Sequence, residues 1–239
     1  MSETWGMILA AGLGTRLRPL TNTLPKPQIK LGDRPIIYHI LDHMYEAKIK
    51  DVVVNVHYLA DRLVKCLSNY DKPLRIHPIY ETKILGTAGG VIHAVKKFEL
   101  SNKKLLVIHG DIVFDYDLSN LINLNDFANL LCVNNKSIAG YEGIVAIDHN
   151  QEITQLGKFF VTAKPYVSKN FFTGIQIFSS KALKLLINMK AESLVKDVYP
   201  IWIKQNLGLK GISASFYYND LGDIKRLKEA NLIALKNNK

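Results

Sequence analysis

The chain has only two cysteines among its 239 residues and no long apolar run. Cys66 and Cys132 are far apart and have no histidine at metal-ligand spacing, so we expect ordinary buried thiols in a reducing compartment. No apolar stretch approaches the roughly 20 residues that a membrane-spanning helix needs. The first residues, from Met1 to Trp5, lack the basic segment of a signal peptide. These absences predict a cytoplasmic protein that does not contact a membrane.

Linkers, repeats and low-complexity segments are also missing from the sequence. No stretch rich in proline, glycine or serine divides the chain, which predicts a single domain over residues 1–239. The hydrophobic share of 48% is high enough for a soluble globular domain with a sizeable core.

The sequence has few acidic residues relative to basic ones, and its formal net charge is +10. The basic residues are spread along the chain, with no arginine-rich arm and no basic stripe interleaved with aromatic residues. This distribution does not favour nucleic acid as a partner, and it favours small phosphorylated ligands weakly.

Predicted strands and helices alternate in the first half of the chain. Apolar spacing and β-branched runs predict strands at residues 6–10, 51–56, 74–80 and 104–111, and helices at 36–47, 60–68 and 91–97. The second half mixes strands at residues 130–133, 143–148 and 171–178 with helices at 182–189, 195–205 and 224–235. The order predicts an α/β fold with a mostly parallel sheet covered by helices on both faces.

A glycine-rich turn follows the first predicted strand, over residues 10–16. Small residues let the backbone approach a ligand, and free N–H groups favour phosphate oxygens. Arg16 and Arg18 follow, and Lys26 stands between two prolines that restrict the chain around it. The segment lacks the third glycine of a dinucleotide fingerprint and the end of a P-loop. It therefore predicts a phosphate-binding turn of another kind.

Two aspartates follow later predicted strands. Asp111 ends the strand at 104–111, and Asp220 precedes Gly222 in a second strand-to-turn segment. Ligands of such sheets bind beyond the carboxyl ends of the strands, so these acids are expected near the glycine turn. Two carboxylates together with substrate phosphates suit Mg²⁺, and an N-cap role for Asp111 is the alternative.

A second glycine-rich segment, residues 86–90, follows Glu81 and is expected to form a turn that opens a helix. Glycines there would let a flat base lie against the backbone, whereas a flexible connection is the alternative interpretation. No Ser/His/Asp or Cys/His arrangement suggests a nucleophilic enzyme.

The segment from Leu9 to Pro27 resembles the signature of the sugar-1-phosphate nucleotidylyltransferases: Leu-Ala-x-Gly-x-Gly-Thr-Arg-Leu, then Pro-Leu-Thr, then Pro-Lys-Pro. Further matches lie at residues 85–89, 110–111, 172–175 and 219–222, so the resemblance covers nearly the whole chain. It implies a Rossmann-like, three-layer α/β/α fold with a mixed, mostly parallel sheet. It also implies a nucleotide-binding half at residues 1–125 and a sugar-phosphate-binding half at 126–239.

The resemblance also implies the roles of individual residues. Nucleotide contacts are expected from Leu9, Ala10, Ala11, Gly12, Gly14, Thr15, Arg16, Glu81, Gly86 and Thr87. Catalysis is expected to depend on Arg16, Lys26 and Asp111, and Mg²⁺ on Asp111 and Asp220. Sugar-phosphate contacts are expected from Gly143, Lys158, Thr173 and Gly174.

The reaction implied is transfer of a nucleotidyl group from an NTP to a sugar-1-phosphate, with release of pyrophosphate. GTP and UTP are both favoured, because short bacterial members include mannose- or heptose-1-phosphate guanylyltransferases and muramate-1-phosphate uridylyltransferases. The chain departs from the family pattern at three places, Gly157, Tyr218 and Asp223. The first replaces the sugar-binding glutamate of a Glu-Lys-Pro motif, which leaves the sugar open.

Two alternatives stay open at this point. A cytidylyltransferase acting on phosphocholine would need an aromatic cage, for which Tyr141, Phe159 and Phe160 are available. A catalytically silent regulatory subunit would bind nucleotide sugars without turning them over. We expect a monomer or a homodimer, and no C-terminal β-helix.

Overall fold

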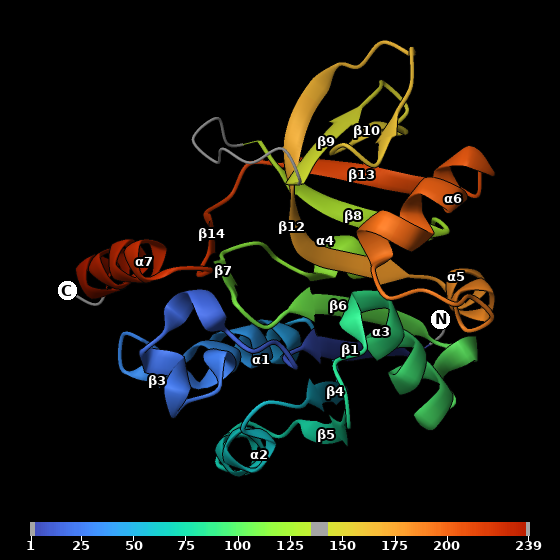
Figure 1. Cartoon of the computed structure of the whole chain (residues 1–239). Coiled ribbons are helices and arrows are strands. Elements are labelled where there is room, and N and C mark those ends of the chain that lie inside the picture. Colours follow the sequence, from blue (N-terminus) through green and yellow to red (C-terminus); the bar gives the residue numbers. More distant parts are fainter. Residues whose placement is uncertain (1–2, 135–142, 238–239) are drawn as a thin grey trace. The chain divides into compact units, whose positions relative to one another are not determined.

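The computed structural model describes residues 3–134 and 143–237 (Figure 1). The chain forms two compact units, each assembled from three separate stretches. The first unit comprises Met1–Trp5, Leu85–Val107 and Ser119–Phe216, and the second comprises Gly6–Ile84, Ile108–Leu118 and Tyr217–Lys239. Neither unit is a continuous segment, so the expected division into ligand-binding halves at residue 125 remains a prediction.

The second unit contains three parallel strands in the order β1, β4, β5. These strands are β1 (Thr4–Leu9), whose first two residues belong to the first unit, β4 (Asp51–Val56) and β5 (Arg75–Tyr80). Every residue of β4 is buried, which agrees with its run of valines. Helix α2 (Ala60–Ser68) contacts β4 and β5, as Figure 1 also shows. The carboxyl ends of the three strands therefore lie at one edge.

The remaining elements of the second unit are short, apart from two helices. After β1 come three 3-10 turns and a small hairpin: η1 (Thr15–Leu17), η2 (Leu20–Asn22), η3 (Lys26–Gln28), β2 (Lys30–Leu31) and β3 (Arg34–Pro35). Helix α1 (Ile36–Glu46) follows, with Ile36, Ile37, Ile40, Leu41 and Met44 buried. The strands β7 (Ile112–Phe114) and β14 (Tyr218–Asp220) pair antiparallel, and α7 (Ile224–Asn237) contacts β14 and β2.

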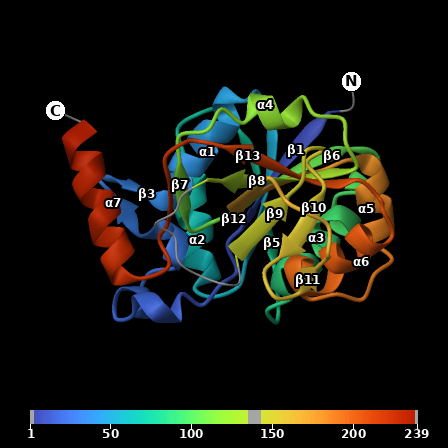
Figure 2. The ribbon, with the colours of Figure 1, turned by 90° about the horizontal axis from the view of Figure 1, so that it is seen from above.

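The first unit contains the mixed part of the sheet. Its strands are β6 (Lys104–His109), which it shares with the second unit, β8 (Ala128–Val133), β9 (Ile144–Ile147), β10 (Ile153–Leu156), β11 (Phe160–Val161), β12 (Ser168–Phe178) and β13 (Leu209–Ala214). They run in the order β11, β10, β9, β12, β6, and β8 pairs with both β12 and β13. The β8–β13 pair is parallel, whereas β12 is antiparallel to β8 and β9 (Figure 2).

An aromatic cluster lies beside one of the helices of the first unit. These helices are α3 (Gly86–Lys97), η4 (Leu100–Asn102), α4 (Ser119–Ile122), α5 (Ser180–Leu186), the π-helix η6 (Leu194–Val198) and α6 (Tyr199–Lys204). The ring of Trp202 lies 5.0 Å from that of Phe127 and 6.0 Å from those of Phe178 and Tyr199. This cluster fastens α6 to the sheet by burying large aromatic surfaces.

The fold class expected from the sequence is confirmed, because the sheet is mixed, mostly parallel and accompanied by helices. Both cysteines are free and buried, as predicted. The expected turn at residues 86–90 is wrong, since α3 already begins at Gly86. Strands β10, β11 and β13 were not predicted. Within residues 3–134 and 143–237, no helix has the length and apolar character that crossing a bilayer requires.

Candidate active site

Two residues of the loop after β1, Gly14 and Thr21, contact each other and stabilise its conformation. Gly14 has a φ of +63°, and a Cβ there would lie 2.8 Å from Cγ2 of Thr21. The Thr21 hydroxyl donates to the Gly14 carbonyl at 2.8 Å. Around Gly12, by contrast, a Cβ would meet nothing within 4 Å. Gly14 therefore shapes the turn, whereas Gly12 leaves open space where a ligand can approach the backbone.

Lys26 lies almost buried in η3, between Pro25 and Pro27, with 8% of its surface exposed. Its ammonium forms an ion pair with Oδ2 of Asp111. Burying an ammonium is costly unless a carboxylate accompanies it. The two prolines and this ion pair hold the Lys26 charge at one place.

Asp111 is brought to Lys26 by the glycine that precedes it. The Gly110 N–H donates to the Leu9 carbonyl at 2.9 Å. A Cβ on Gly110 would lie 2.8 Å from that same carbonyl oxygen, so a side chain would separate the two segments. Gly110 thus places Asp111 beside the end of β1, where the phosphate-binding turn begins.

Asp220 lies next to Asp111 because β14 pairs with β7. Asp220 is opposite Ile112, and the Leu221 N–H donates to the Asp111 carbonyl at 2.9 Å. A Cβ on Gly222 would lie 2.9 Å from Oδ1 of Asp220 and 3.3 Å from Nη2 of Arg16. Two carboxylates and the Arg16 guanidinium therefore meet at one place.

The pKa values of the two carboxyl groups, Asp111 and Asp220, are shifted in opposite directions. Burial alone would raise the pKa of Asp111, but the charge and hydrogen bond of Lys26 outweigh it and lower that pKa. Burial and then the neighbouring Asp111 raise the pKa of Asp220. Arg226 partly compensates, since its Nη1 lies 3.1 Å from Oδ2 of Asp220. The positive charges of Lys26, Arg16 and Arg226 thus surround the two carboxyl groups.

Asn55 was not expected as a site residue, yet it joins two expected ones. Its Oδ1 accepts the Ala10 N–H at 2.7 Å, and its Nδ2 donates to Oε1 of Glu81 at 2.7 Å. Asn55 and Glu81 are 3% and 5% exposed. The Ala10 N–H is therefore used inside the protein and is not available to a ligand. A lone amide inside the run Val52-Val53-Val54-Asn55-Val56 was the sequence signal for it.

Gly86 and Thr87 belong to the first unit, where their contacts with the segment before η6 account for both residue types. Gly86 has a φ of +73°, and a Cβ there would lie 2.3 Å from the carbonyl oxygen of Glu192. That carbonyl accepts the Ala88 N–H at 2.9 Å, and the Thr87 hydroxyl accepts the Leu194 N–H at 2.9 Å. These contacts tie the start of α3 to η6, which explains why the helix begins at Gly86.

The residues expected to contact the sugar phosphate also lie in the first unit. Thr173 is 1% exposed, and its hydroxyl donates to the Leu131 carbonyl at 2.7 Å. It sits with Gly174, whose φ is +80°, where the register of β12 against β8 shifts. The Thr173 hydroxyl therefore stabilises a β-bulge, and only other atoms of this bulge can reach a ligand.

Lys158 is exposed in the turn between β10 and β11, and Gly143 precedes β9. Gly157 has a φ of +50°, so the departure from the family's glutamate coincides with a left-handed turn residue. Lys158 and Lys196 each place Nζ 5.6 Å from the centre of the Phe159 ring. Phe160 is buried, and Tyr141 lies outside the described residues.

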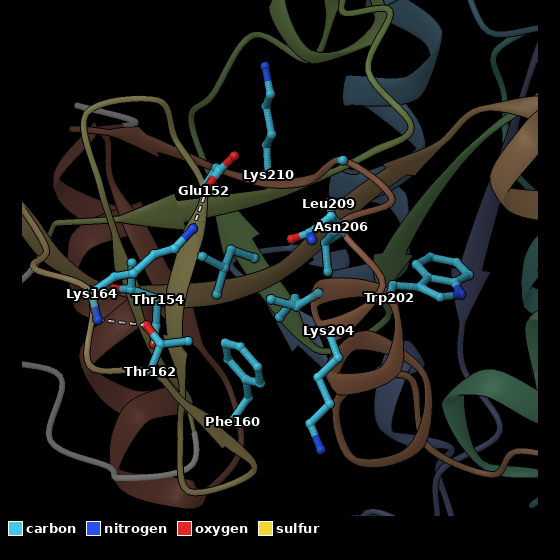
Figure 3. Close-up of a pocket in the computed structure, with 13 residues that line it drawn as sticks. Glu152, Thr154, Phe160, Thr162, Lys164, Trp202, Lys204, Asn206, Leu209 and Lys210 are labelled. Carbon is cyan, nitrogen blue, oxygen red and sulfur yellow. Dashed lines mark hydrogen bonds and ion pairs between the residues drawn. The ribbon is translucent and has the colours of Figure 1, made fainter.

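A cavity of about 350 Å³ in the first unit is shown in Figure 3. It is lined by residues of β10, β11, α6 and β13, and none of the residues predicted to contact the nucleotide, the sugar phosphate or the metal is among them. Phe160, a candidate for the aromatic cage of the alternative function, does line it. Lys164 lies 3.2 Å from Glu152, and Lys210 lies 3.0 Å from Asp126, so carboxylates already accompany both ammonium groups. The cavity is therefore not a part of the predicted site.

Among the described residues, no cluster of three or more histidines, cysteines or acids could hold a metal ion by itself. Asp111 and Asp220 form a pair only. A cation bound there would need further ligands from a substrate or from water, as Mg²⁺ often does.

Comparison with known proteins places the chain among enzymes that act on nucleotides. The model of the family described as nucleotidyl transferase matches residues 5–237. The bifunctional protein GlmU of Methanococcus aeolicus is 33% identical over 237 residues, which cover 97% of this chain and 54% of that protein. The mannose-1-phosphate guanyltransferase of Debaryomyces hansenii is 30% identical over 238 residues, with 96% and 64% covered. The chain thus spans less than two thirds of either relative.

Solved structures show the same fold. HddC from Yersinia pseudotuberculosis, in a complex with GMP-PN, has a TM-score of 0.79 at 23% identity, with 98% of this chain and 100% of that chain covered. A putative glucose-1-phosphate thymidylyltransferase from Bacillus anthracis has a TM-score of 0.77 at 23% identity, with 97% and 95% covered.

Proposed function

The chain belongs to the nucleotidyl transferase family, and from this we propose that it transfers a nucleotidyl group from an NTP to a sugar-1-phosphate. The products would be an NDP-sugar and pyrophosphate. The names of the relatives support this acceptor class, because several of the relatives found by sequence are mannose-1-phosphate guanyltransferases. The full activity is a proposal for this chain, which spans only part of each relative's length.

One observation carries the proposal: Lys26, Asp111, Asp220 and Arg16 converge beside the glycine turn of the second unit. Nucleotidyl transfer joins two anions, so its main obstacle is electrostatic repulsion. Fixed cations placed where negative charge accumulates lower that barrier. No residue in this set is a nucleophile, and the reaction does not need one.

A divalent cation fits Asp111 and Asp220. Asp111 directly precedes β7, and Asp220 is the last residue of β14, which pairs with β7. Burial and then the neighbouring Asp111 raise the pKa of Asp220. We infer that Mg²⁺ is the resident ion, since it is held by one or two carboxylates together with phosphates. When bound, it would supply positive charge to the phosphates of the substrates.

The residues of the chain have distinct roles in this proposal. An oxygen of the sugar-1-phosphate forms a bond to the α-phosphorus of the NTP, and the bond from that phosphorus to the bridging oxygen breaks. The attacking oxygen is already anionic near neutral pH, so no general base is required. Lys26 would hold the α-phosphate and Arg16 the departing pyrophosphate. Fixed geometry would supply much of the remaining rate.

We favour GTP over UTP because of the carboxylate of Glu81. An ionised carboxylate only accepts hydrogen bonds. Guanine presents two adjacent donors, N1–H and N2–H₂, whereas uracil has one N–H between two carbonyl groups. Glu81 follows β5 at the edge where β1 also ends, and it is almost buried. Such a residue matches guanine best among the common bases.

The test is incubation of the full chain with Mg²⁺, each of the four NTPs and a panel of sugar-1-phosphates, with pyrophosphate release as the readout. We expect the largest release with GTP. Release with CTP and phosphocholine would instead support the cytidylyltransferase alternative. Nucleotide-sugar binding without turnover of any pair would overturn the enzymatic proposal in favour of a silent regulatory subunit.

A further inference from the structure

Asn55 is placed to connect the ends of three strands. In the parallel register it is opposite Leu9 of β1 and Ile79 of β5. Its side chain contacts the first residue after β1, Ala10, and the first residue after β5, Glu81. Ligands of parallel sheets bind beyond such strand ends. One buried carboxamide therefore touches both the phosphate-binding turn and the proposed base-binding residue.

The orientation of the Asn55 carboxamide is fixed by the backbone N–H of Ala10. The Ala10 N–H is a donor only, so the Asn55 atom that faces it at 2.7 Å must be the oxygen. A flipped amide would put two donors against each other in a buried place, which costs the hydrogen bond and the desolvation of both groups. The Asn55 NH₂ group must therefore face residue 81.

This fixed donor dictates what residue 81 can present to a ligand. Oε1 of Glu81 accepts from Asn55 at 2.7 Å. A glutamate keeps acceptor capacity on its other oxygen as well, because each carboxylate oxygen can accept more than one hydrogen bond. A glutamine at this position would have to turn its own oxygen toward Asn55, and its NH₂ group would then face away. Because of the Asn55 NH₂ group, a glutamate at position 81 presents a hydrogen-bond acceptor to a ligand, whereas a glutamine would present a donor.

We propose that Asn55 is a specificity-determining positioning residue, which fixes Glu81 as an acceptor for the donor edge of guanine. This inference rests on the proposed function, and it adds the residue that sets the choice of base. The chain of hydrogen bonds runs from the Ala10 N–H through Asn55 to Glu81. Reversing the polarity of residue 81 alone weakens the preference for guanine, and reversing residue 55 as well restores it.

The test is a double-mutant cycle with Glu81→Gln and Asn55→Asp. The readout is the ratio of kcat/KM for GTP to that for UTP, and the melting temperature of each variant monitors folding. In Glu81→Gln the amide faces the base, so the GTP/UTP ratio should fall about 10- to 100-fold, the range of one bidentate base contact. Asn55→Asp alone sets two carboxylates against each other, and kcat/KM should fall for every NTP.

The double variant decides the matter. The new aspartate accepts both from the Ala10 N–H and from the new glutamine, whose oxygen then faces the base, so most of the GTP preference should return. A ratio that Glu81→Gln leaves unchanged, or that stays equally low in the double variant, overturns the proposal. Glu46→Gln, which removes a carboxylate from the surface of α1, is the matched control and should not change the ratio.

A second measurement separates this inference from the proposed function. Calorimetric Kd values for GTP and UTP report the base preference without any turnover. A wild-type chain that releases no pyrophosphate but prefers GTP in binding, with the preference lost and restored as above, overturns the enzymatic function and supports the role of Asn55. Turnover with a base preference that neither substitution changes would support the enzymatic function and overturn the role of Asn55.

Discussion

Lys26 and Asp111 form the ion pair at the centre of the candidate site. We expect Lys26→Met to lower kcat/KM by about 10²- to 10³-fold, the usual loss when one electrostatic contact to the reacting groups is removed. The methionine keeps most of the buried length, so the fold should survive. Steady-state pyrophosphate release measures the effect. Lys30→Met, at an exposed position in the following strand β2, is the control, and an equal loss there would contradict a special role for Lys26.

Three of the glycines predicted to contact the nucleotide should respond differently to substitution by alanine. Gly86→Ala combines a φ of +73° with a Cβ 2.3 Å from the Glu192 carbonyl oxygen, so it should destabilise the protein by about 3 kcal/mol. Gly14→Ala should also destabilise it, because of the φ of +63° and the contact with Thr21. Urea unfolding measures both changes.

Gly12→Ala is the informative contrast, because a Cβ there meets nothing within 4 Å. Its free energy of unfolding should stay within about 1 kcal/mol of the wild-type value. Its affinity for GTP, measured by calorimetry, should fall nonetheless, because the added methyl group occupies space that a ligand needs. Unchanged affinity would show that no ligand approaches the backbone at Gly12.

At the scale of elements, ion pairs of one aspartate connect the amino-terminal ends of β4 and β5. Asp51 is 4% exposed, Arg75 donates to it through Nε at 2.7 Å, and Nε2 of His77 lies 2.9 Å from it. The hydrogen bond from Arg75 lowers the pKa of Asp51, although burial opposes this. The carboxylate therefore stabilises the folded state above its unfolded pKa of about 3.9, and this contribution is lost as pH falls through the folded pKa.

We predict that Asp51→Asn lowers the free energy of unfolding at pH 7 by about 2 kcal/mol. The difference from wild type should shrink as pH falls from about 4 toward the lowered pKa of Asp51. Urea titrations at stepped pH values measure both quantities. A difference that stays constant down to pH 2 would contradict the assignment. The exposed Asp33→Asn controls for the loss of one negative charge.

The elements that could be predicted from the sequence are those with a strong period. The helix α1 and the strand β4 were predicted within a residue, since burial on one or both faces leaves a regular apolar pattern. The strand β5 was also predicted within a residue, although Ile79 is its one buried residue. Strands β10, β11 and β13 were missed because they are short or partly exposed, and the pairing partner decides their structure. The first turns of α3 were missed because Glu192 and Leu194, a hundred residues away, stabilise them.

The site residues divide in a similar way. Lys26, Asp111 and Asp220 were named from their sequence context, yet only the fold shows that Lys26 pairs with Asp111 and that Arg226 pairs with Asp220. Asp223, a departure from the family pattern, accepts the Arg226 N–H at 2.9 Å and so caps α7. The burial of the Thr173 hydroxyl follows from a β-bulge, which an isolated strand pattern does not reveal.

At the scale of the whole molecule, both units depend on residues from distant parts of the chain. The second unit, which holds Lys26, takes β14 and α7 from residues 217–239. A fragment of residues 1–125 would lack Asp220 and the strand that pairs with β7. We predict that it does not unfold cooperatively, in contrast to the full chain. Thermal denaturation followed by circular dichroism tests this, and a cooperative transition of the fragment would show that its half is autonomous.

The ion pair of Lys26 and Asp111 also couples binding events at the site. A metal cation that takes over the Asp111 carboxylate leaves the Lys26 ammonium without its counter-charge and so favours a phosphate beside it. A phosphate that draws Lys26 away likewise leaves Asp111 more attractive to a cation. Thermodynamic reciprocity requires both effects to be equal in free energy. Metal and nucleotide are therefore expected to bind with positive cooperativity, each raising the affinity for the other by the same factor.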